Sequence, residues 1–227
     1  MTIDQYINSS IGKKTVMAAT GLFLCLFLVE HLYSNLLLLF TDGGVAFTEW
    51  SHTLVHNMFI RLVEVFLFAA IILHVVQAVY LTKQSSDARP VKYAVYKVNE
   101  TSSPFSRNMG ISGSLILFFI VVHMWQFFVP YRIMDTVGGE GQVNVAETIK
   151  EAFQNPWYVL LYVASATFLA FHLNHGFQSA FTTLGLNSKK YKGLISLFGS
   201  FFAFGFVGLG FSIIPILFYF GIAGNTF

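Results

Sequence analysis

The sequence predicts an all-α membrane protein with five transmembrane helices, and two observations carry this prediction. Its 227 residues are 55% hydrophobic and only 11% charged, whereas an ordinary soluble domain has about 25% charged residues. Five apolar runs also reach the roughly 20 residues needed to cross a 30 Å hydrocarbon core. These runs are approximately 14–40, 57–83, 107–131, 156–184 and 194–221.

The first run follows "MTIDQYINSSIGKK" and is longer than the apolar core of a signal peptide, so we expect it to remain as a membrane helix. Cys25, the single cysteine, lies within it, which excludes a disulfide framework. Because the connections between the runs are short, we expect residues 1–227 to form one domain, in which the first four helices form a bundle. We find no internal repeat, and the net charge of +2 gives no reason to expect a nucleic-acid partner.

Basic residues gather at alternate ends of the runs. Ten of the thirteen lie on one predicted side of the membrane: Lys13, Lys14, Lys83, Arg89, Lys92, Lys97, Arg107, Lys189, Lys190 and Lys192. The excess of lysine and arginine in cytoplasmic loops therefore predicts a cytoplasmic N-terminus. The connection 83–107 is the longest on this side, and its polar, basic character indicates a docking surface for a partner.

Five of the seven histidines lie inside the first four runs, at positions 31, 74, 123, 172 and 175. An ionisable side chain within hydrocarbon is costly unless it has a partner, so each of these histidines is a candidate functional residue.

Counting 1.5 Å per helical residue places these histidines at two depths. His31 and His123 lie about 25 and 24 Å from the cytoplasmic edge, while His74 and His172 lie about 25 and 24 Å from the outer edge. His175 lies about 28 Å from the outer edge, one turn further in. The sequence therefore predicts an outer pair, His31 and His123, and an inner pair, His74 and His172.

Two level pairs of histidines on facing helices favour two bis-histidine haem sites, separated by about 10–12 Å along the membrane normal. Structural zinc is less suited, because it needs four ligands that converge on one point. Small residues that would let a flat macrocycle approach the helices give weaker support: Gly21, Gly110, Gly113, Ala164, Ala166, Ala170 and Gly176.

Four stretches then resemble a known family: "LFLVEHLYSN", "ILHVVQAVY", "FFIVVHMWQF" and "FHLNHGFQSAF". From about residue 10 to 220, the chain resembles the five-helix, di-haem cytochrome b anchor of bacterial succinate dehydrogenases and quinol:fumarate reductases. This resemblance implies one haem ligand from each of the first four helices, paired first with third and second with fourth. The family pattern His-x-x-x-Gly fits His172 and Gly176, and it leaves His175 outside the ligand set.

The resemblance also implies the cofactors and partners. The chain would hold two haem b groups in a bacterial cytoplasmic membrane and would bind an iron–sulfur subunit and an FAD-containing flavoprotein subunit at its cytoplasmic face. Electrons would pass from succinate through the iron–sulfur clusters and haems to a quinone, commonly menaquinone, with no dicarboxylate site on this chain. Ala170 stands where some quinol:fumarate reductases carry a glutamate that moves protons, which favours succinate oxidation over the reverse reaction.

Quinone reduction needs proton-donating groups near the outer pair. The candidates are Glu30, Glu49, His52, His56, Arg61 and Glu64. For each of these residues a structural role stays open: Arg61 and Glu64 have the spacing of a helical ion pair, and the neighbouring Trp50 suits an interfacial aromatic belt. Two functional roles stay open for Glu30: it could orient His31, or it could carry protons.

Three alternatives to a succinate dehydrogenase anchor remain open. The chain could be the cytochrome b subunit of another respiratory dehydrogenase, such as formate dehydrogenase or hydrogenase, although those distribute their haem ligands differently. It could also be an ion-coupled transporter that uses its histidines as a proton relay, but no run is broken in the way typical of transporters. A structural scaffold is the third alternative, because a lone histidine can simply bond a serine or asparagine of a neighbouring helix.

Overall fold

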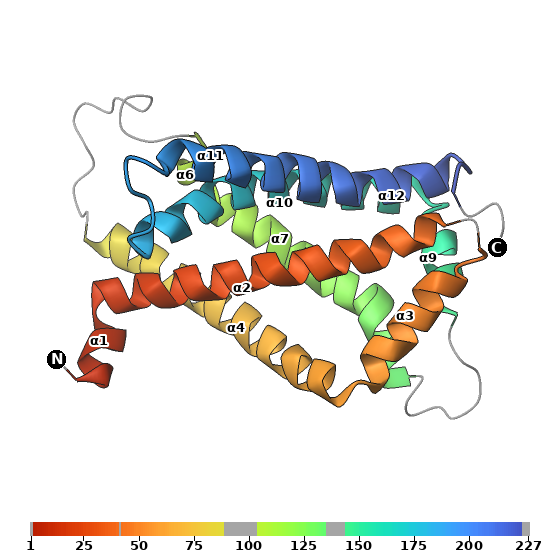
Figure 1. Cartoon of the computed structure of the whole chain (residues 1–227), viewed down its shortest axis with the longest axis horizontal. Helices are drawn as coiled ribbons and strands as arrows, with labels where there is room; N and C mark the ends of the chain where they lie inside the picture. Colours follow the sequence, from red (N-terminus) through yellow and green to blue (C-terminus); the bar gives the residue numbers. More distant parts are fainter. Residues whose placement is uncertain (1, 41, 89–103, 135–143, 224–227) are drawn as a thin grey trace.

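The computed structural model describes residues 2–40, 42–88, 104–134 and 144–223, and every regular element within these ranges is a helix (Figure 1). The long helical stretches are α2 (Ser10–Leu36), α4 (Met58–Asp87), α7 (Met109–His123), α10 (Pro156–Thr183) and α11 (Lys192–Ser200) with its continuations. Short helices fill the connections: α1 (Ile3–Asn8), η1 (Leu37–Leu39), α3 (Val45–His56), α6 (Pro104–Arg107) and α9 (Val145–Ala152). The all-helical fold class is therefore confirmed.

Five helical stretches are long and apolar enough to cross a membrane: Ser10–Leu39, Met58–Asp87, Met109–Tyr131, Pro156–Thr183 and Lys192–Tyr219. They coincide with the five predicted runs, and the ends differ by a few residues. The second helix continues past the apolar run to Asp87, because the polar residues after Lys83 can still adopt a helical conformation.

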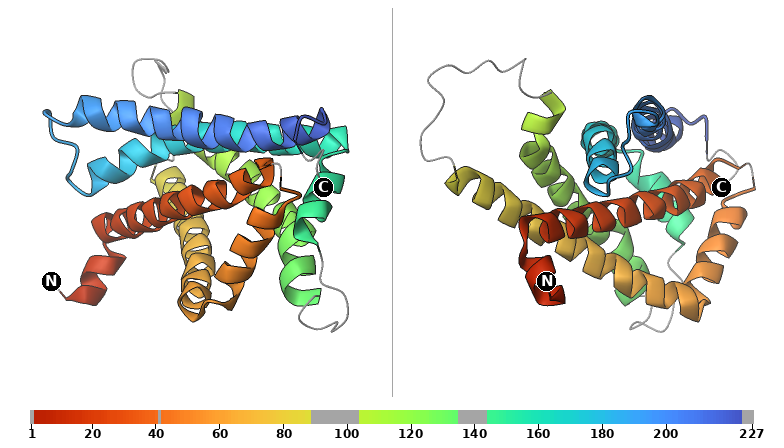
Figure 2. Two further views of the ribbon diagram at one scale, coloured as in Figure 1. Left: turned by 45° about the vertical axis from the view of Figure 1, so that its right-hand side comes forward. Right: turned by 60° about the vertical axis from the view of Figure 1, so that its left-hand side comes forward.

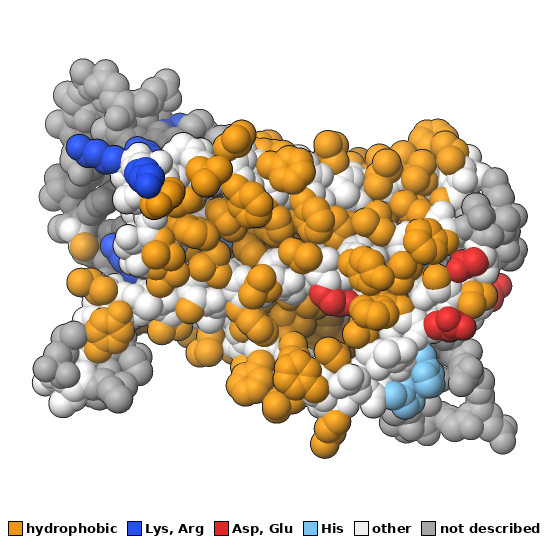
Figure 3. Space-filling model, in the orientation of Figure 1, with side chains coloured by type: hydrophobic (Ala, Val, Ile, Leu, Met, Phe, Trp, Pro, Cys, Tyr) orange, Lys and Arg blue, Asp and Glu red, His pale blue; other side chains and the backbone are white. Residues whose placement is uncertain are grey.

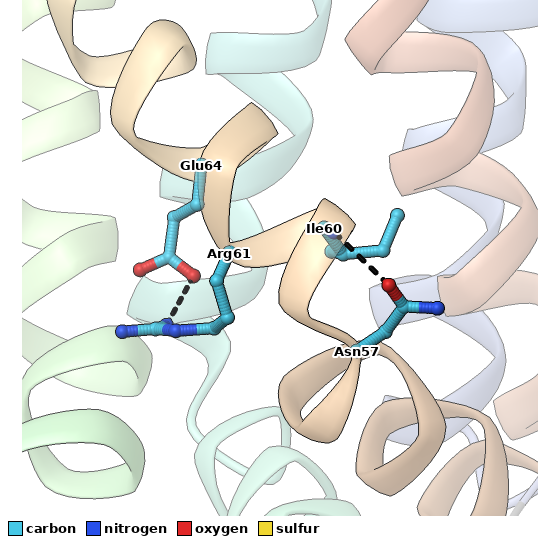
Figure 4. A network of polar contacts seen from close by, with 4 residues as sticks. All are labelled: Asn57, Ile60, Arg61 and Glu64. Atoms are coloured by element: carbon cyan, nitrogen blue, oxygen red, sulfur yellow. Dashed lines mark hydrogen bonds and ion pairs between the residues drawn. The ribbon is translucent and has the colours of Figure 1, made fainter.

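Asparagine caps fix where the second and fourth of these helices begin. Oδ1 of Asn57 accepts hydrogen bonds from the backbone N–H groups of Phe59 and Ile60 (Figure 4), and Asn155 accepts one from Trp157. Pro156 occupies the first turn of α10, where its missing N–H group costs nothing. Local sequence therefore sets the depth at which the histidines of both helices sit.

The first four spans pack as a four-sided bundle with one open side. Helix α4 packs mainly against α2, α2 also packs against α10, and α10 packs against α7. No comparably extensive contact joins α4 to α7 among the described residues, although the rings of Phe68 on α4 and Phe128 in the continuation of α7 meet at 5.4 Å. The course of these helices can be followed in Figures 1 and 2. Helices α2 and α7 are thus diagonal to each other, as are α4 and α10.

The fifth span lies outside this bundle, along α10. It consists of α11, η3 (Phe201–Leu209) and α12 (Gly210–Tyr219), drawn in blue (Figure 1). Glycines permit the close approach. A methyl group at Gly210 would lie 2.6 Å from Cδ2 of Leu32, and one at Gly199 would lie 2.9 Å from Cδ1 of Phe177.

Two spans are less regular than the sequence predicts. The third span widens into a π-helix at Met124–Met134 (η2), which contains Pro130, and the fifth does so over Phe201–Leu209. A proline removes one backbone donor, and π-type turns accommodate such a defect without unwinding the helix. The spans are therefore distorted but remain helical through the described residues.

The surface matches a membrane environment. Large apolar side chains are exposed along the spans, including Leu26, Val65, Phe118 and Leu209. Figure 3 shows this apolar belt on one face, with lysine and arginine side chains at the end near α11 and acidic side chains at the opposite end. The ends of the bundle thus differ in charge, as the loop charges predict.

Candidate functional site

The outer pair of histidines meets across one diagonal of the bundle. His31 on α2 and His123 on α7 have ring centroids 5.7 Å apart, with their planes nearly perpendicular at 84°. His31 is further enclosed by Phe27, whose ring stacks at 5.1 Å, and by Phe211 of the fifth span at 5.6 Å. The two rings therefore meet in an edge-on contact inside a largely aromatic enclosure.

The inner pair meets across the other diagonal. His74 on α4 and His172 on α10 have ring centroids 6.3 Å apart and an interplanar angle of 65°. The pairing of the first span with the third, and of the second with the fourth, is thus the arrangement that depth along the helices predicts. The structure brings together all four residues predicted as axial ligands, in two separate pairs.

Hydroxyl groups from neighbouring helices lie beside three of the four rings. Nδ1 of His123 is 3.1 Å from the hydroxyl of Tyr162, Nδ1 of His74 is 3.2 Å from Oγ1 of Thr20, and Nδ1 of His172 is 3.3 Å from Oγ of Ser112. A hydrogen bond at one ring nitrogen fixes the tautomer and leaves the other as a metal ligand. The arrangement therefore orients Nε2 as the available ligand atom in these three rings.

Small residues stand against the inner pair. A methyl group at Gly21 would lie 3.3 Å from Cε1 of His74, and one at Gly113 would lie 3.6 Å from Cε1 of His172. Methyl groups at Gly110 and Gly176 would meet no atom within 4 Å. Of the four glycines that the sequence singled out, Gly21 and Gly113 are therefore the two that lie against the imidazole ring of an inner histidine.

The ring separations fit a single metal ion between the members of each pair. Two imidazoles that bind one ion from opposite sides, at metal–nitrogen distances of about 2 Å, have centroids about 6 Å apart. The observed separations are 5.7 and 6.3 Å. In the described part of the chain no three His, Cys, Asp or Glu residues converge as a structural zinc site would require.

The open side of the bundle carries an apolar recess of about 500 Å³. Phe68 of α4 lines one wall of this recess, and the other wall comes from α7 and η2, including Trp125. A smaller recess of about 270 Å³ lies between α2 and α4, beside Thr20. Both recesses are lined almost entirely by apolar atoms, which suits the face of a macrocycle or a lipid chain.

Glu30 lies in a polar cluster beside the outer pair. Its Oε1 accepts hydrogen bonds from the Ser34 hydroxyl and from Nε1 of Trp50 at 3.3 Å, and Trp50 also donates to Ser34 at 2.8 Å. Trp50 belongs to α3, so the cluster ties this short helix to the first span. The sequence left open that Trp50 belongs to an interfacial aromatic belt. The structure adds a hydrogen bond from Trp50 to the carboxylate of Glu30, the residue before His31.

The other quinone and proton candidates lie at the surface of α3 and the start of α4. Arg61 and Glu64 form an ion pair at 2.5 Å (Figure 4), as their spacing predicts. His52 and His56 are exposed and stack on each other, with centroids 3.9 Å apart. Glu49 is exposed on the same helix. The structure therefore separates Glu30 and Glu64, which are partly buried, from the exposed residues Glu49, His52, His56 and Arg61.

The hydroxyl partners were not among the predicted site residues, although the sequence contains a signal for two of them. Thr20 and Gly21 precede His31 by eleven and ten residues, and Ser112 and Gly113 precede His123 by the same intervals. Eleven residues make slightly more than three helical turns, so each hydroxyl shares a helix face with an outer histidine while reaching the inner level. The pattern consists of two residues and one histidine in each span, which is too short to stand out in a single sequence.

Comparison with known proteins gives one match. The family model for the succinate dehydrogenase/fumarate reductase transmembrane subunit matches residues 85–207, just over half of the chain. The matched part contains His123, His172 and His175, whereas His31 and His74 lie before it. Neither a curated protein nor a solved structure matches the chain.

Proposed function

Because the chain belongs to the succinate dehydrogenase/fumarate reductase transmembrane subunit family, we propose that it is the di-haem cytochrome b anchor of a succinate:quinone oxidoreductase. The proposal rests on one observation: two pairs of histidines lie on the two diagonals of the bundle. The ring centroids are 5.7 Å apart in the outer pair and 6.3 Å apart in the inner pair. No other arrangement of titratable groups in the described spans offers two equivalent sites.

The axial ligands would be His31 and His123 for the outer haem and His74 and His172 for the inner haem. Haem iron held by two imidazoles supplies one-electron transfer between the iron–sulfur clusters of a partner subunit and a quinone. The protein contributes the ligand orientation. Thr20, Ser112 and Tyr162 hold Nδ1 of their histidines, and such outer-shell bonds also make a ligating imidazole more basic.

Glu30 is the strongest candidate for delivering protons to a quinone at the outer level. It adjoins His31 in sequence, it is partly buried within a span, and two donors hold its Oε1 atom. A proton donor must lie within hydrogen-bond reach of the quinone oxygen or one water away. The exposed residues Glu49, His52 and His56 on α3 would connect this position to the aqueous phase.

The basic end of the bundle would bind the iron–sulfur and flavoprotein subunits, in the cytoplasm of a bacterium. Lysine and arginine side chains gather there (Figure 3), and the same end holds the α10–α11 connection with Lys189 and Lys190. The predicted docking segment 83–107 extends the basic character of this end, although residues 89–103 lie outside the described ranges. Menaquinone would be the electron acceptor by analogy with the family.

We favour succinate oxidation over fumarate reduction because of Ala170. Its side chain is 2% exposed, and a methyl group added at Gly208 of η3 would lie 3.1 Å from its Cβ atom. A glutamate in place of Ala170 would have to displace the fifth span. A proton route through this position, which the resemblance associates with some quinol:fumarate reductases, is therefore not part of the proposal.

A reduced-minus-oxidised optical spectrum of the purified complex tests the proposal. We expect b-type haem bands, two haems for each copy of this chain, and reduction of those bands by succinate in native membranes. Absence of haem would overturn the redox assignment and would favour a transporter or scaffold. Reduction by formate or hydrogen, but not by succinate, would move the chain to another respiratory dehydrogenase.

A further inference from the structure

Each of the four axial histidine candidates is followed three residues later by a polar residue. The four pairs are His31–Ser34, His74–Gln77, His123–Gln126 and His172–His175. A step of three residues keeps a side chain on nearly the same helix face and moves it about 4.5 Å along the axis. Since the first and third spans run opposite to the second and fourth, each polar residue lies between its histidine and the nearer end of the bundle.

The two polar residues beyond the outer pair have partners within the protein. Ser34 bonds Glu30 and Trp50, and Oε1 of Gln126 accepts a hydrogen bond of 3.1 Å from the Tyr162 hydroxyl. These residues therefore complete networks that already exist around the outer pair, and they leave no orphaned polar atom there.

Gln77, which lies beyond the inner pair, differs from Ser34 and Gln126 in its hydrogen bonding. Its Oε1 atom is buried and makes no hydrogen bond within the described structure. A buried polar group without a partner is destabilising, and native proteins retain few such groups without a function. A half-turn of the amide would exchange Oε1 for the NH2 group, so the same position can present a donor to a ligand.

The chemistry next to Gln77 favours an acidic ligand. His175 occupies the equivalent place on α10, one turn beyond His172, and is partly buried. One turn beyond Gln77 on α4, the Tyr80 hydroxyl accepts a hydrogen bond of 3.0 Å from Nζ of Lys13. An amide, an imidazole and an ammonium group thus form a ladder of potential donors that leads from the inner pair to the basic end of the bundle.

We propose that Gln77 and His175 bind the carboxylate groups of the inner haem; this inference rests on the proposed haem sites. A haem b carries both of its carboxylates on one edge, and a carboxylate left among apolar side chains would be costly. Gln77 is the first polar side chain beyond His74 on α4, and His175 lies one turn beyond His172 on α10. Asn174 comes before His175, but its Oδ1 atom already accepts hydrogen bonds from Ser200 and Gln178. Gln77 and His175 act as positioning residues, because they fix the rotation of the haem about its iron and do not touch the iron.

The test uses the complete complex purified from membranes, with the variants Gln77→Met and His175→Leu. We expect both haems to remain bound at first, with a shifted propionate bending band in the resonance Raman spectrum of the inner haem. We also expect the inner haem to dissociate about tenfold faster in detergent, as for loss of a charge-assisted hydrogen bond. His175→Gln, which keeps a donor, should restore both properties towards those of the natural protein.

Gln126→Leu is the matched control, because Gln126 stands at the same spacing from His123 yet has its own partner. It should leave the inner haem signals unchanged. Unchanged Raman bands and haem release in both Gln77→Met and His175→Leu would overturn the inference while leaving the two-haem proposal intact. A natural complex without haem would instead overturn the proposed function itself. If Gln77→Met does not assemble, the comparison of His175→Leu with His175→Gln decides the question.

Discussion

The hydroxyl of Tyr162 on α10 lies 3.1 Å from Nδ1 of His123 on α7, and it donates in turn to Oε1 of Gln126. If Nε2 of His123 holds the proposed outer haem, Nδ1 carries the proton, so the chain of donors runs from the imidazole through the phenol to the amide. Tyr162 would then orient a ligand of the outer haem, although it lies on the helix that would supply a ligand to the inner haem.

Tyr162→Phe removes both bonds and should raise the midpoint potential of the outer haem. Loss of the acceptor at Nδ1 makes the imidazole less basic, which stabilises ferrous iron relative to ferric iron. A redox titration of the purified complex, followed at the haem bands, measures the change. The inner haem should keep its potential.

Tyr158→Phe is the control for this experiment, since it makes the same chemical change one turn earlier on the same helix. A shift of similar size in both variants would mean that the effect comes from general repacking of α10. The relay would then have no special influence on the outer haem.

His172 and His175 have different roles in the proposal, and alanine substitutions separate them. His172→Ala should leave one haem per chain, because the inner iron loses an axial ligand. His175→Ala should keep two. Quantitative haem assay against protein concentration distinguishes these outcomes, and the reverse pattern would make His175 the ligand of the fourth span.

Gly21→Val should expel the inner haem. The first added carbon already lies 3.3 Å from Cε1 of His74, and the branches of valine would force the imidazole away from its place opposite His172. We expect a haem-to-chain ratio near one, with the chain still inserted in the membrane.

Gly110→Val provides the comparison, because a Cβ atom added at Gly110 meets no atom within 4 Å. It should keep both haems. Equal loss of haem from the two variants would indicate that valine disturbs these membrane helices generally, whatever the position of the glycine.

The five spans and the pairing of the histidines could be predicted because hydrocarbon imposes simple rules. Length and apolarity define a span, and a rise of 1.5 Å per residue gives depth. Depth alone could not reveal which side chains bond His74 or His123, because that depends on the rotation of each helix about its axis. Thr20 and Ser112 illustrate the limit: threonine and serine are common in membrane helices, and only packing shows which of them reach an imidazole.

The π-helical segments and the Glu30 cluster were beyond prediction for a related reason. Pro130 signals a local defect, but whether the helix kinks, unwinds or widens depends on its neighbours. Glu30 has its partners one turn away at Ser34 and twenty residues away at Trp50. The second contact exists because α3 folds back against α2, a tertiary arrangement that hydropathy does not encode.

Glu30→Gln should lower quinone turnover by about tenfold or more, the scale of effect typical for a group that transfers protons. Glutamine has nearly the same shape and still accepts hydrogen bonds from Ser34 and Trp50, so the fold should persist. Succinate-dependent reduction of a soluble quinone analogue measures turnover, and haem content verifies assembly. Normal turnover with intact haems would assign Glu30 a structural role only.

Glu64→Gln makes the same change at a residue whose carboxylate is engaged by Arg61 at 2.5 Å. A partly exposed ion pair of this kind contributes less than about 1 kcal/mol to the free energy of unfolding. We therefore expect a small decrease in thermal stability and unchanged quinone turnover. Impaired turnover with unchanged stability would place Glu64, rather than Glu30, at the quinone.

Gly210→Leu should detach the fifth span from the bundle without direct damage to any histidine. Its first side-chain carbon would lie 2.6 Å from Cδ2 of Leu32, which is 2% exposed and has no free space to move into. Overpacking of this kind costs about 1–3 kcal/mol. Thermal unfolding of the purified complex should show the loss. Gly193→Leu is the control, because a Cβ atom added at Gly193 meets no atom within 4 Å. Since Phe211, the neighbour of Gly210, packs against His31 at 5.6 Å, the outer haem should be released before the inner haem as the temperature rises. Release in the opposite order would show that the fifth span does not support the outer site.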